Sequence, residues 1–147
     1  MWRSAGCLGL SVGLLLIVAA CGPSTPRPAG GPVVTISEQD FRLDVAPPQV
    51  PAGWVTLQVS NAGPSTHEVL IVATTEPDGR LVLRPDGVTV DEDALDSHKV
   101  GSVDGLLPGT HRTLRLRLSA GRYELFCNMA GHYLTGMHTG LTVTPSQ

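Results

Sequence analysis

Short runs of alternating apolar and polar residues fill the chain from Val33 to Val143. Three of these runs alternate strictly: Phe41-x-Leu43-x-Val45, Val55-x-Leu57-x-Val59 and Leu114-x-Leu116-x-Leu118. A period of two is typical of β-strands that bury one face and expose the other. Turn residues separate the runs, as at Asn61-Ala62-Gly63-Pro64 and Ala120-Gly121. The pattern therefore predicts an all-β domain, built as an antiparallel sandwich or barrel.

Four further runs complete the expected strands, at Val33–Ile36, Val69–Ala73, Tyr123–Cys127 and Leu141–Val143. The run Val69–Ala73 is uninterrupted by polar residues, which predicts a strand buried on both faces. The stretch from Leu81 to Val100 has a weaker pattern. Within it, Asp91–Leu95 begins with acidic residues, which suit a helix N-terminus, so we expect one short helix there.

The N-terminal residues have the pattern of an export signal rather than of the domain. Arg3 precedes an apolar run from Leu8 to Ala20, which is too short and poorly flanked for a permanent membrane span. The run ends in Val18-Ala19-Ala20-Cys21, which resembles the bacterial lipobox. Residues 1–20 are therefore predicted to be a signal peptide, with lipidation of Cys21. The alternative is an ordinary cleaved signal followed by a chance cysteine.

Residues 21–32 hold four prolines and three glycines between Gly22 and Pro32, a composition that cannot form a core. We interpret this segment as a tether and residues 33–147 as the folded domain. The lipid would anchor the domain to a membrane, facing the periplasm or the extracellular side. We expect the domain to be a monomer.

Cysteine and charge counts narrow the possible functions. The chain has three cysteines, and the predicted mature domain keeps Cys127 without a partner for a disulfide. Metal ligation is a good reason to keep one thiol in an oxidising compartment. Loss of Arg3 with the signal leaves 9 basic against 13 acidic residues, a net charge of −4. This balance argues against a nucleic-acid partner.

The most specific motif is Cys127-x₄-His132-x₄-Met137, which joins a thiolate, an imidazole and a thioether at five-residue spacings. This set of soft and intermediate ligands favours copper over magnesium or calcium. A third strong ligand would complete a trigonal His₂Cys site with a weak axial Met. His67 meets this need, because it follows a turn and begins a buried strand, although it lies sixty residues upstream.

These residues and their strand context resemble the cupredoxins, the blue-copper family of plastocyanin, azurin, rusticyanin and sulfocyanin. The ligand loop is most similar to that of rusticyanin and sulfocyanin, and Gly121-x-Tyr123-x₃-Cys127 resembles the family's tyrosine corner. The resemblance implies a Greek-key β-sandwich that holds one mononuclear type 1 copper. By this resemblance His67, Cys127 and His132 are equatorial ligands, and Met137 is the axial ligand.

The resemblance also implies that the ring of His132 reaches the surface through an apolar patch of Met129, Ala130, Tyr133 and Leu134. Taken alone, Met129 is expected to be a packing residue.

One position departs from the family. Glu68 follows His67, where several members have an Asn or Ser that helps to hold the thiolate. A carboxylate pointing inward would lower the reduction potential, but strand neighbours face opposite sides, so we expect Glu68 to point outward. The remaining histidines, His98, His111 and His138, are expected at the surface.

Two functions remain open. The first is electron transfer between redox proteins such as a cytochrome, an oxidase or a reductase, with transient docking. The second is copper binding for delivery or storage at the cell surface, because delivery proteins use the same ligand types. A copper enzyme is not expected, since nitrite reductases and multicopper oxidases need further copper sites and the chain has no spare His-x-His pair. A dinuclear copper domain would need a second cysteine in the loop.

Overall fold

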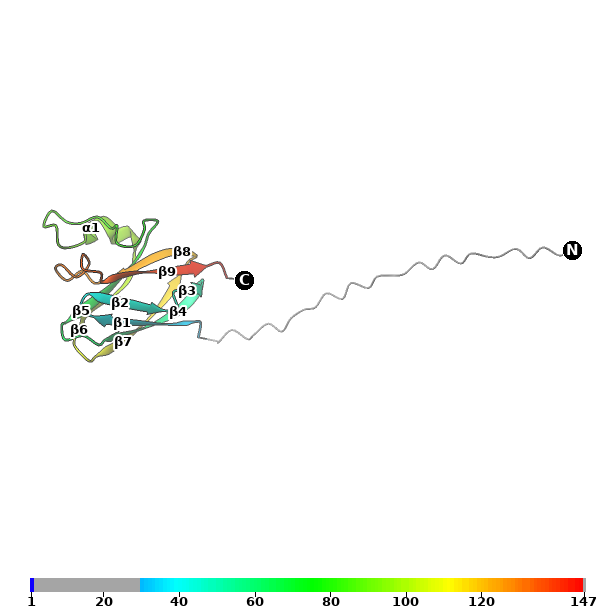
Figure 1. The fold of residues 1–147 in the computed structure, drawn as a ribbon, viewed down its shortest axis with the longest axis horizontal. Coiled ribbons are helices and arrows are strands. Elements are labelled where there is room, and N and C mark those ends of the chain that lie inside the picture. Colours follow the sequence, from blue (N-terminus) through cyan, green and yellow to red (C-terminus); the bar gives the residue numbers. More distant parts are fainter. Residues whose placement is uncertain (2–29, 147) are drawn as a thin grey trace.

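The computed structural model describes Met1 and residues 30–146 and shows a two-layered β-sandwich (Figure 1). The described residues form nine strands, one short α-helix and one 3₁₀-helix. In chain order these are β1 (Val33–Gln39), β2 (Arg42–Ala46), β3 (Gln49–Pro51), β4 (Gly53–Asn61), β5 (His67–Ala73), α1 (Glu92–Leu95), η1 (Asp96–His98), β6 (Lys99–Leu106), β7 (His111–Leu118), β8 (Gly121–Phe126) and β9 (His138–Thr144). The predicted β-sandwich with one short helix is confirmed.

The strands form a four-stranded sheet in the order β2-β1-β4-β7 and a five-stranded sheet in the order β3-β9-β8-β5-β6. Most neighbours are antiparallel, but β1 pairs with β4 in parallel and β3 pairs with β9 in parallel. The sandwich is thus mainly antiparallel, as predicted, and these two parallel pairs are the departures from that prediction. After the β1–β2 hairpin the chain crosses to the other sheet as β3. The chain then returns to the first sheet as β4, which runs in the same direction as β1, so β1 and β4 pair in parallel.

Two elements lie where the pattern was weak. Strand β6 contains two glycines and an aspartate among its eight residues, so it lacks the strict alternation of a half-buried strand. Strand β3 is three residues long and ends at Pro51, in a stretch that the prolines mark as an interruption. The expected helix is present as α1, with Asp91 at its N-cap position.

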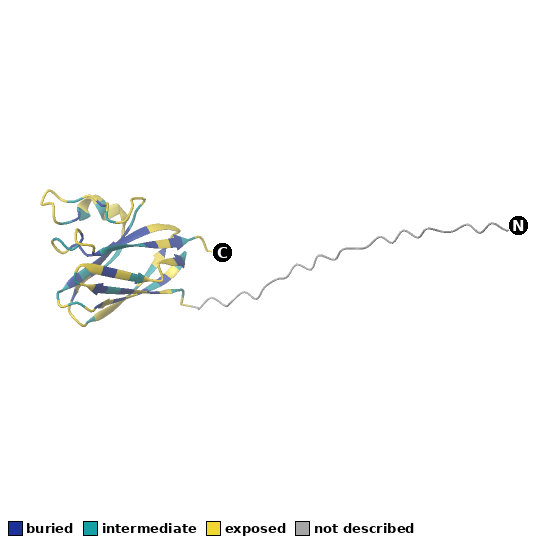
Figure 2. Cartoon of the chain, viewed as in Figure 1, coloured by how far each residue is buried: buried dark blue, intermediate teal, exposed yellow. Residues whose placement is uncertain are grey.

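The main core lies between the two sheets, where inward-facing residues of both sheets pack together. A second apolar cluster covers the outer face of the five-stranded sheet, where Leu70 and Val72 of β5 meet Leu81 and Val90. Strand β5 is thus buried on both faces, as its uninterrupted apolar run predicted. In Figure 2 the dark-blue buried positions follow the strands, while α1 has no buried residue and most loops are exposed.

Tyr123 forms the expected corner of the sandwich. Its side chain is 5% exposed, and its hydroxyl donates a hydrogen bond to the carbonyl oxygen of Ser119 at 2.9 Å. This contact closes the turn before β8 at the end of the strand away from Cys127. The tyrosine corner therefore fixes the start of the strand that leads into the ligand loop.

The segment between β5 and β6 fastens the loop that follows β8. Tyr133 accepts a hydrogen bond from the Leu81 N–H at 3.0 Å and donates one to Glu124 Oε1 at 2.9 Å. The Asn128 amide pairs with Val90 in both directions, since its Oδ1 accepts from Val90 N–H at 2.6 Å and its Nδ2 donates to Val90 O at 3.1 Å. The chemistry-bearing loop is therefore held from outside the sheet as well as by its own strands.

Glu38 is a carboxylic acid buried inside the sandwich. It is 0% exposed, it shares the inward face of β1 with Val34 and Ile36, and neither of its carboxyl oxygens has a hydrogen-bond partner. Burial, and then the nearby charge of Glu68, raise the pKa of Glu38 from 4.5 to about 8. The folded protein therefore holds this carboxyl in its neutral form at neutral pH.

The sequence predicted a signal peptide and a lipid anchor in place of a membrane-spanning helix. Among the residues that the structure describes, no helix is long and apolar enough to span a membrane. The predicted signal peptide and Cys21 lie outside the described residues. The signal peptide and the lipidation of Cys21 therefore remain predictions.

We expect Glu38 to lower the stability of the metal-free protein as the pH rises from about 4.5 to about 8. In this window the folded state still binds the Glu38 proton, whereas the unfolded state has lost it, so deprotonation favours unfolding. The loss is on the order of a few kcal/mol. Urea unfolding at a series of pH values measures it, and Glu38→Gln should flatten the curve. The exposed control Glu76→Gln should leave the slope unchanged, and an equal slope in Glu38→Gln would contradict this assignment.

We expect Tyr133→Phe to lower the free energy of unfolding by about 1–3 kcal/mol, because the buried Leu81 N–H loses its acceptor. The Leu81 amide should also exchange faster with deuterium. Tyr123→Phe is the matched control, since its hydroxyl bonds the carbonyl oxygen of Ser119 and not the Leu81 segment, so Leu81 should stay protected. Unchanged exchange at Leu81 in Tyr133→Phe would show that the hydroxyl does not hold this segment.

Candidate metal centre

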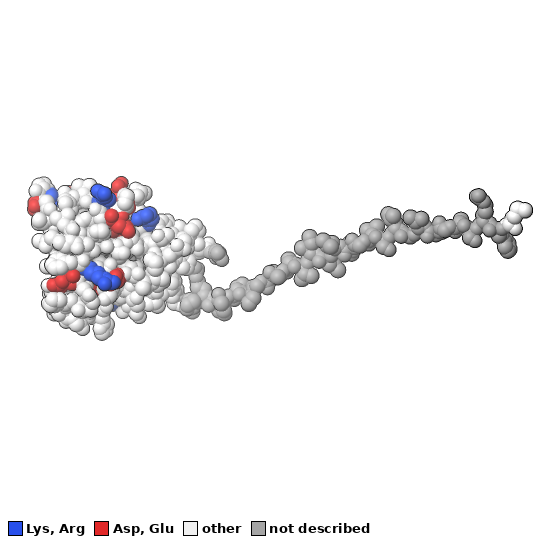
Figure 3. All heavy atoms as spheres, in the orientation of Figure 1, with Lys and Arg blue, Asp and Glu red and all other residues white. Residues whose placement is uncertain are grey.

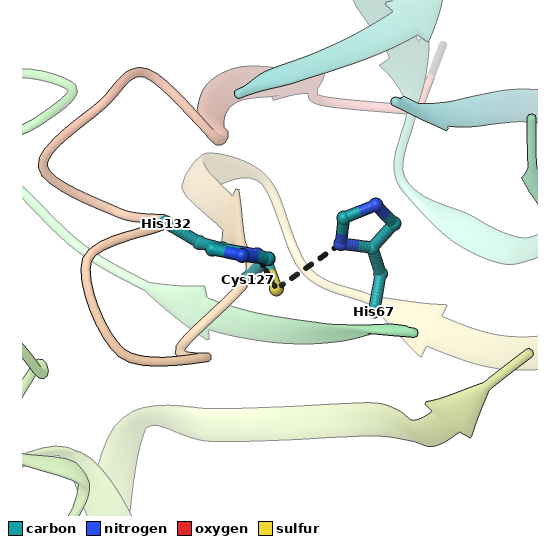
Figure 4. Close-up of side chains that lie close together, drawn as sticks. All are labelled: His67, Cys127 and His132. Atoms are coloured by element: carbon teal, nitrogen blue, oxygen red, sulfur yellow. Dashed lines mark hydrogen bonds between the residues drawn. The ribbon is translucent and has the colours of Figure 1, made fainter. Parts of the chain in front are cut away.

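Strand pairing brings His67 next to Cys127. Strands β5 and β8 pair antiparallel, with Leu70 opposite Phe126 and Ile71 opposite Leu125. Continued by one step, this register places Cys127 diagonal to His67 on the inner face of the sheet. His67 is the first residue of β5, and Cys127 directly follows β8. Their side chains are both 0% exposed, with His67 Nδ1 at 4.0 Å from the sulfur (Figure 4).

The tight loop after β8 supplies the second imidazole. The N–H of Met137 donates to the carbonyl of His132, and the N–H of Cys127 donates to the carbonyl of Met137, each at 3.0 Å. These bonds fold the loop back on itself and place His132 Nδ1 at 3.4 Å from the Cys127 sulfur. His132 is partly exposed, and its ring lies on the opposite side of the sulfur from His67 in Figure 4.

The three predicted equatorial residues therefore converge. One ligand atom from each of His67, Cys127 and His132 lies within 4.8 Å of the others. Met137 is 0% exposed, and its backbone is hydrogen-bonded to both Cys127 and His132. This places its residue at the site, while its role as axial ligand stays a prediction.

The environment of Cys127 keeps its thiol protonated until a cation replaces the proton. Burial raises the pKa of the thiol to about 11, and the charges of Glu38 and Glu68 act in the same direction. The backbone N–H groups of Glu68 and Met129 oppose this shift by hydrogen bonding to the sulfur. At neutral pH the thiol is therefore protonated in the metal-free protein. A soft metal ion that displaces the proton would supply the charge that stabilises the thiolate.

His67 is oriented by a carboxylate that the sequence did not single out. Its Nε2 lies 3.0 Å from Asp40 Oδ1, and Asp40 also accepts a hydrogen bond from the Ser65 hydroxyl at 2.8 Å. The hydrogen bond from the Ser65 hydroxyl contributes most to lowering the pKa of Asp40. Burial lowers the pKa of His67, so a neutral ring is available as a ligand.

Glu68 lies on the outer face of β5, as the alternation of strand neighbours predicted. There its carboxyl accepts a hydrogen bond from the backbone N–H of Asn128 and lies near Glu92, Asp104 and Lys99. Burial, followed by Glu92 and Asp104, raises the pKa of Glu68. Its side chain therefore contacts the base of the ligand loop from outside the sandwich.

The surface around His132 is apolar, with two differences from expectation. Met129 is 41% exposed and so belongs to the surface rather than to the packing, whereas Tyr133 is 2% exposed and is held in the interior by its hydroxyl. Leu134 is 53% exposed, as expected for a patch residue. Phe41, from the β1–β2 turn, is 56% exposed and packs edge-on against the His132 ring at 5.9 Å between centroids. Its strand pattern gave no sign of this contact.

The other histidines lie away from the sulfur. His98 and His111 are exposed, as expected. His138 is partly exposed, so it meets the expectation of a surface residue only in part. Its ring packs against Tyr133 at 5.0 Å between centroids and contacts Gly79, and its Nδ1 is buried at 3.9 Å from Glu124 Oε1. Through its contact with Tyr133, His138 helps to support the ligand loop.

The donor set fits copper. Two imidazole nitrogens and one thiolate in a buried cluster, with a thioether nearby in sequence, are the ligand types of a mononuclear type 1 copper site. Hard cations such as magnesium and calcium prefer oxygen ligands, which this cluster lacks among the described residues. The residues present therefore match the predicted copper cofactor.

Comparison with solved structures finds a similar sandwich in two auracyanins and a rusticyanin. Auracyanin from Roseiflexus castenholzii aligns with a TM-score of 0.58 at 23% identity, covering 80% of this chain and 99% of its own. Auracyanin A from Chloroflexus aurantiacus, described as a blue copper protein, gives 0.56 at 21%, covering 78% and 100%. Rusticyanin from Thiobacillus ferrooxidans gives 0.53 at 18%, covering 76% and 77%. At these identities the likeness concerns the fold.

Comparison with curated protein sequences finds no match. The sulfocyanin (SoxE) domain family, in contrast, matches residues 47–146, which include the four predicted copper ligands. That match extends over more than half of the chain and agrees with the sandwich, the convergent donors and the tyrosine corner. The chain belongs to the sulfocyanin domain family of cupredoxins.

Proposed function

We propose that this protein is a type 1 copper protein that carries single electrons between redox partners outside the cytoplasm. The observation that supports this most strongly is the convergence of His67, Cys127 and His132 within 4.8 Å at one end of a rigid sandwich. These three residues would hold the copper equatorially, with Met137 as the weak axial ligand. Copper, when bound there, supplies a one-electron Cu(II)/Cu(I) couple.

The chain's own residues would keep the ligands still while the charge changes. His67 and Cys127 are fully buried at adjacent strand ends, and the ligand loop is fastened through Asn128 and Tyr133. Side chains held this way cannot readily change their geometry, which favours fast electron exchange over exchange of the metal. This rigidity favours electron transfer over the alternative of copper delivery or storage, which calls for ligands that release the metal.

The surface near His132 suits brief docking. Phe41, Met129 and Leu134 are exposed apolar residues near the partly exposed imidazole of His132, and together they would form an apolar docking patch around this ligand. On the face drawn in Figure 3, acidic and basic side chains lie next to one another rather than in separate patches. Contacts such as Arg84–Asp93 and Arg122–Asp78 pair them locally. We therefore assign the docking of a redox protein to the apolar patch.

The location is part of the same proposal. Export by residues 1–20 and lipidation of Cys21 would hold a monomeric domain on a membrane surface, with residues 21–32 as a tether of up to roughly 35 Å. Strand β1 starts at Val33, at the end of the sandwich away from the ligand loop (Figure 1). In that arrangement the metal centre would be free to meet its partners.

We expect the copper-loaded protein to be intensely coloured and to give the narrow copper hyperfine splitting of a type 1 site in electron paramagnetic resonance. Cys127→Ser should abolish the colour without unfolding the sandwich, because it removes the thiolate and leaves the strands intact. Cys21→Ser is the matched control and should keep the colour. A colourless wild-type protein with ordinary tetragonal Cu(II) signals would count against electron transfer, and colour in Cys127→Ser would refute the ligand assignment.

We expect Met137→Leu to keep the colour and to raise the reduction potential, because the loss of a weak thioether donor destabilises Cu(II) more than Cu(I). Electrochemistry of both proteins measures the difference. Met129→Leu, at the exposed methionine of the same loop, is the matched control and should leave the potential close to that of the wild type. An unchanged potential in Met137→Leu would remove Met137 from the site.

A further inference from the structure

The two-residue turn between β1 and β2 touches both histidines of the metal centre. Gln39 pairs with Arg42 across the hairpin, so Asp40 and Phe41 form its tip. Asp40 Oδ1 lies 3.0 Å from Nε2 of the fully buried His67, and the Phe41 ring packs edge-on against His132. The turn is remote in sequence from both histidines, and neither residue belongs to the predicted ligand set.

The backbone around this turn is shaped to hold it against the site. Phe41 has a φ of +66°, a left-handed conformation that is unusual for a bulky side chain and is kept only when the surroundings enforce it. Gly63 packs so closely on Asp40 that an added Cβ would lie 2.9 Å from Asp40 Oδ1. Gly136 packs on the other side, where a Cβ would lie 3.3 Å from the Phe41 carbonyl oxygen. The loops before His67 and after His132 thus clamp the turn.

The contacts of Asp40 determine which nitrogen of His67 can bind a metal. Asp40 accepts from the Ser65 hydroxyl at 2.8 Å and faces His67 Nε2 with the other oxygen. A carboxylate can only accept, so Nε2 must carry the ring proton and Nδ1 must keep its lone pair. The lone pair of Nδ1 points to the Cys127 sulfur (Figure 4).

We propose that Asp40 is a positioning residue of the metal centre, which fixes the Nε2–H tautomer of His67 and biases the site toward oxidised copper. The inference rests on the proposed function. A carboxylate that accepts from a ligating imidazole makes the ring a stronger donor, and its negative charge stabilises Cu(II) more than Cu(I). Asp40 would therefore hold the reduction potential below the value that the three ligands and Met137 alone would set.

The first test needs no metal. In the metal-free full chain, ¹⁵N-resolved NMR of the imidazole rings should show His67 as the Nε2–H tautomer at neutral pH. Asp40→Ala should lose this preference. A wild-type His67 with its proton on Nδ1 would overturn the proposal, whether or not the protein binds copper.

The second test separates charge from shape in the copper-loaded full chain. Asp40→Asn keeps an acceptor oxygen near Nε2 but loses the charge, so the preference for Cu(II) over Cu(I) should fall about tenfold. That change corresponds to a rise in potential of about 59 mV for one electron. The matched control is Asp44→Asn, which removes the same charge from the same hairpin, where Asp44 pairs with Arg42 in solvent. In Asp44→Asn the preference for Cu(II) over Cu(I) should stay within about threefold of the wild-type preference.

The outcomes distinguish the two proposals. A coloured wild-type protein whose potential is the same in Asp40→Asn would overturn the role of Asp40 and leave electron transfer standing. Equal shifts in Asp40→Asn and Asp44→Asn would also overturn it, since they would reflect general charge rather than contact with His67. A colourless wild-type protein would refute the proposed function, and the NMR tautomer would then decide the role of Asp40.

Discussion

The antiparallel register of β5 and β8 is the constraint on which the rest of the site depends. It places residue 67 and residue 127 on the same inner face, although sixty residues separate them. Because side chains alternate along a strand, a slip of one residue would turn His67 or Cys127 to the outer face and separate the donors. The register is protected by burial on both faces of β5, where Leu70 and Val72 pack outward and Val69 and Ile71 pack inward.

Around this pair the protein adds supports from three directions. The segment before α1 fastens the ligand loop through Tyr133 and Asn128, and the β1–β2 turn reaches His67 through Asp40. Glu68 contacts the base of the loop from the outer face. These polar groups have defined partners. Elsewhere in the described interior, Glu124 Oε2, His138 Nδ1 and both carboxyl oxygens of Glu38 have none, and Glu38 lowers stability when it ionises. Such supports make a metal geometry reproducible.

Much of the fold and the ligand set could be predicted because both follow local rules. Strict alternation identified β4 and β7, and the spacing of Cys127, His132 and Met137 identified a loop whose residues the structure brings to His67. Strand β6 was not predicted because glycines break its alternation. The two parallel pairs depend on where the chain crosses between sheets, which no local pattern encodes. The contacts of Asp40 and Phe41 could not be predicted either, since they arise where a remote turn meets the loops in space. The buried ring of His138 depends on the same kind of long-range packing.

The central claim is that one copper ion lies between side chains drawn from two distant parts of the chain. A crystal structure of the copper-loaded protein, with the metal located by its anomalous scattering, tests this most directly. The account predicts a single site bonded to the Nδ1 atoms of His67 and His132 and to the Cys127 sulfur, with Met137 at a longer distance. Copper bound elsewhere, or a His67 ring turned away from the sulfur in the loaded protein, would contradict it.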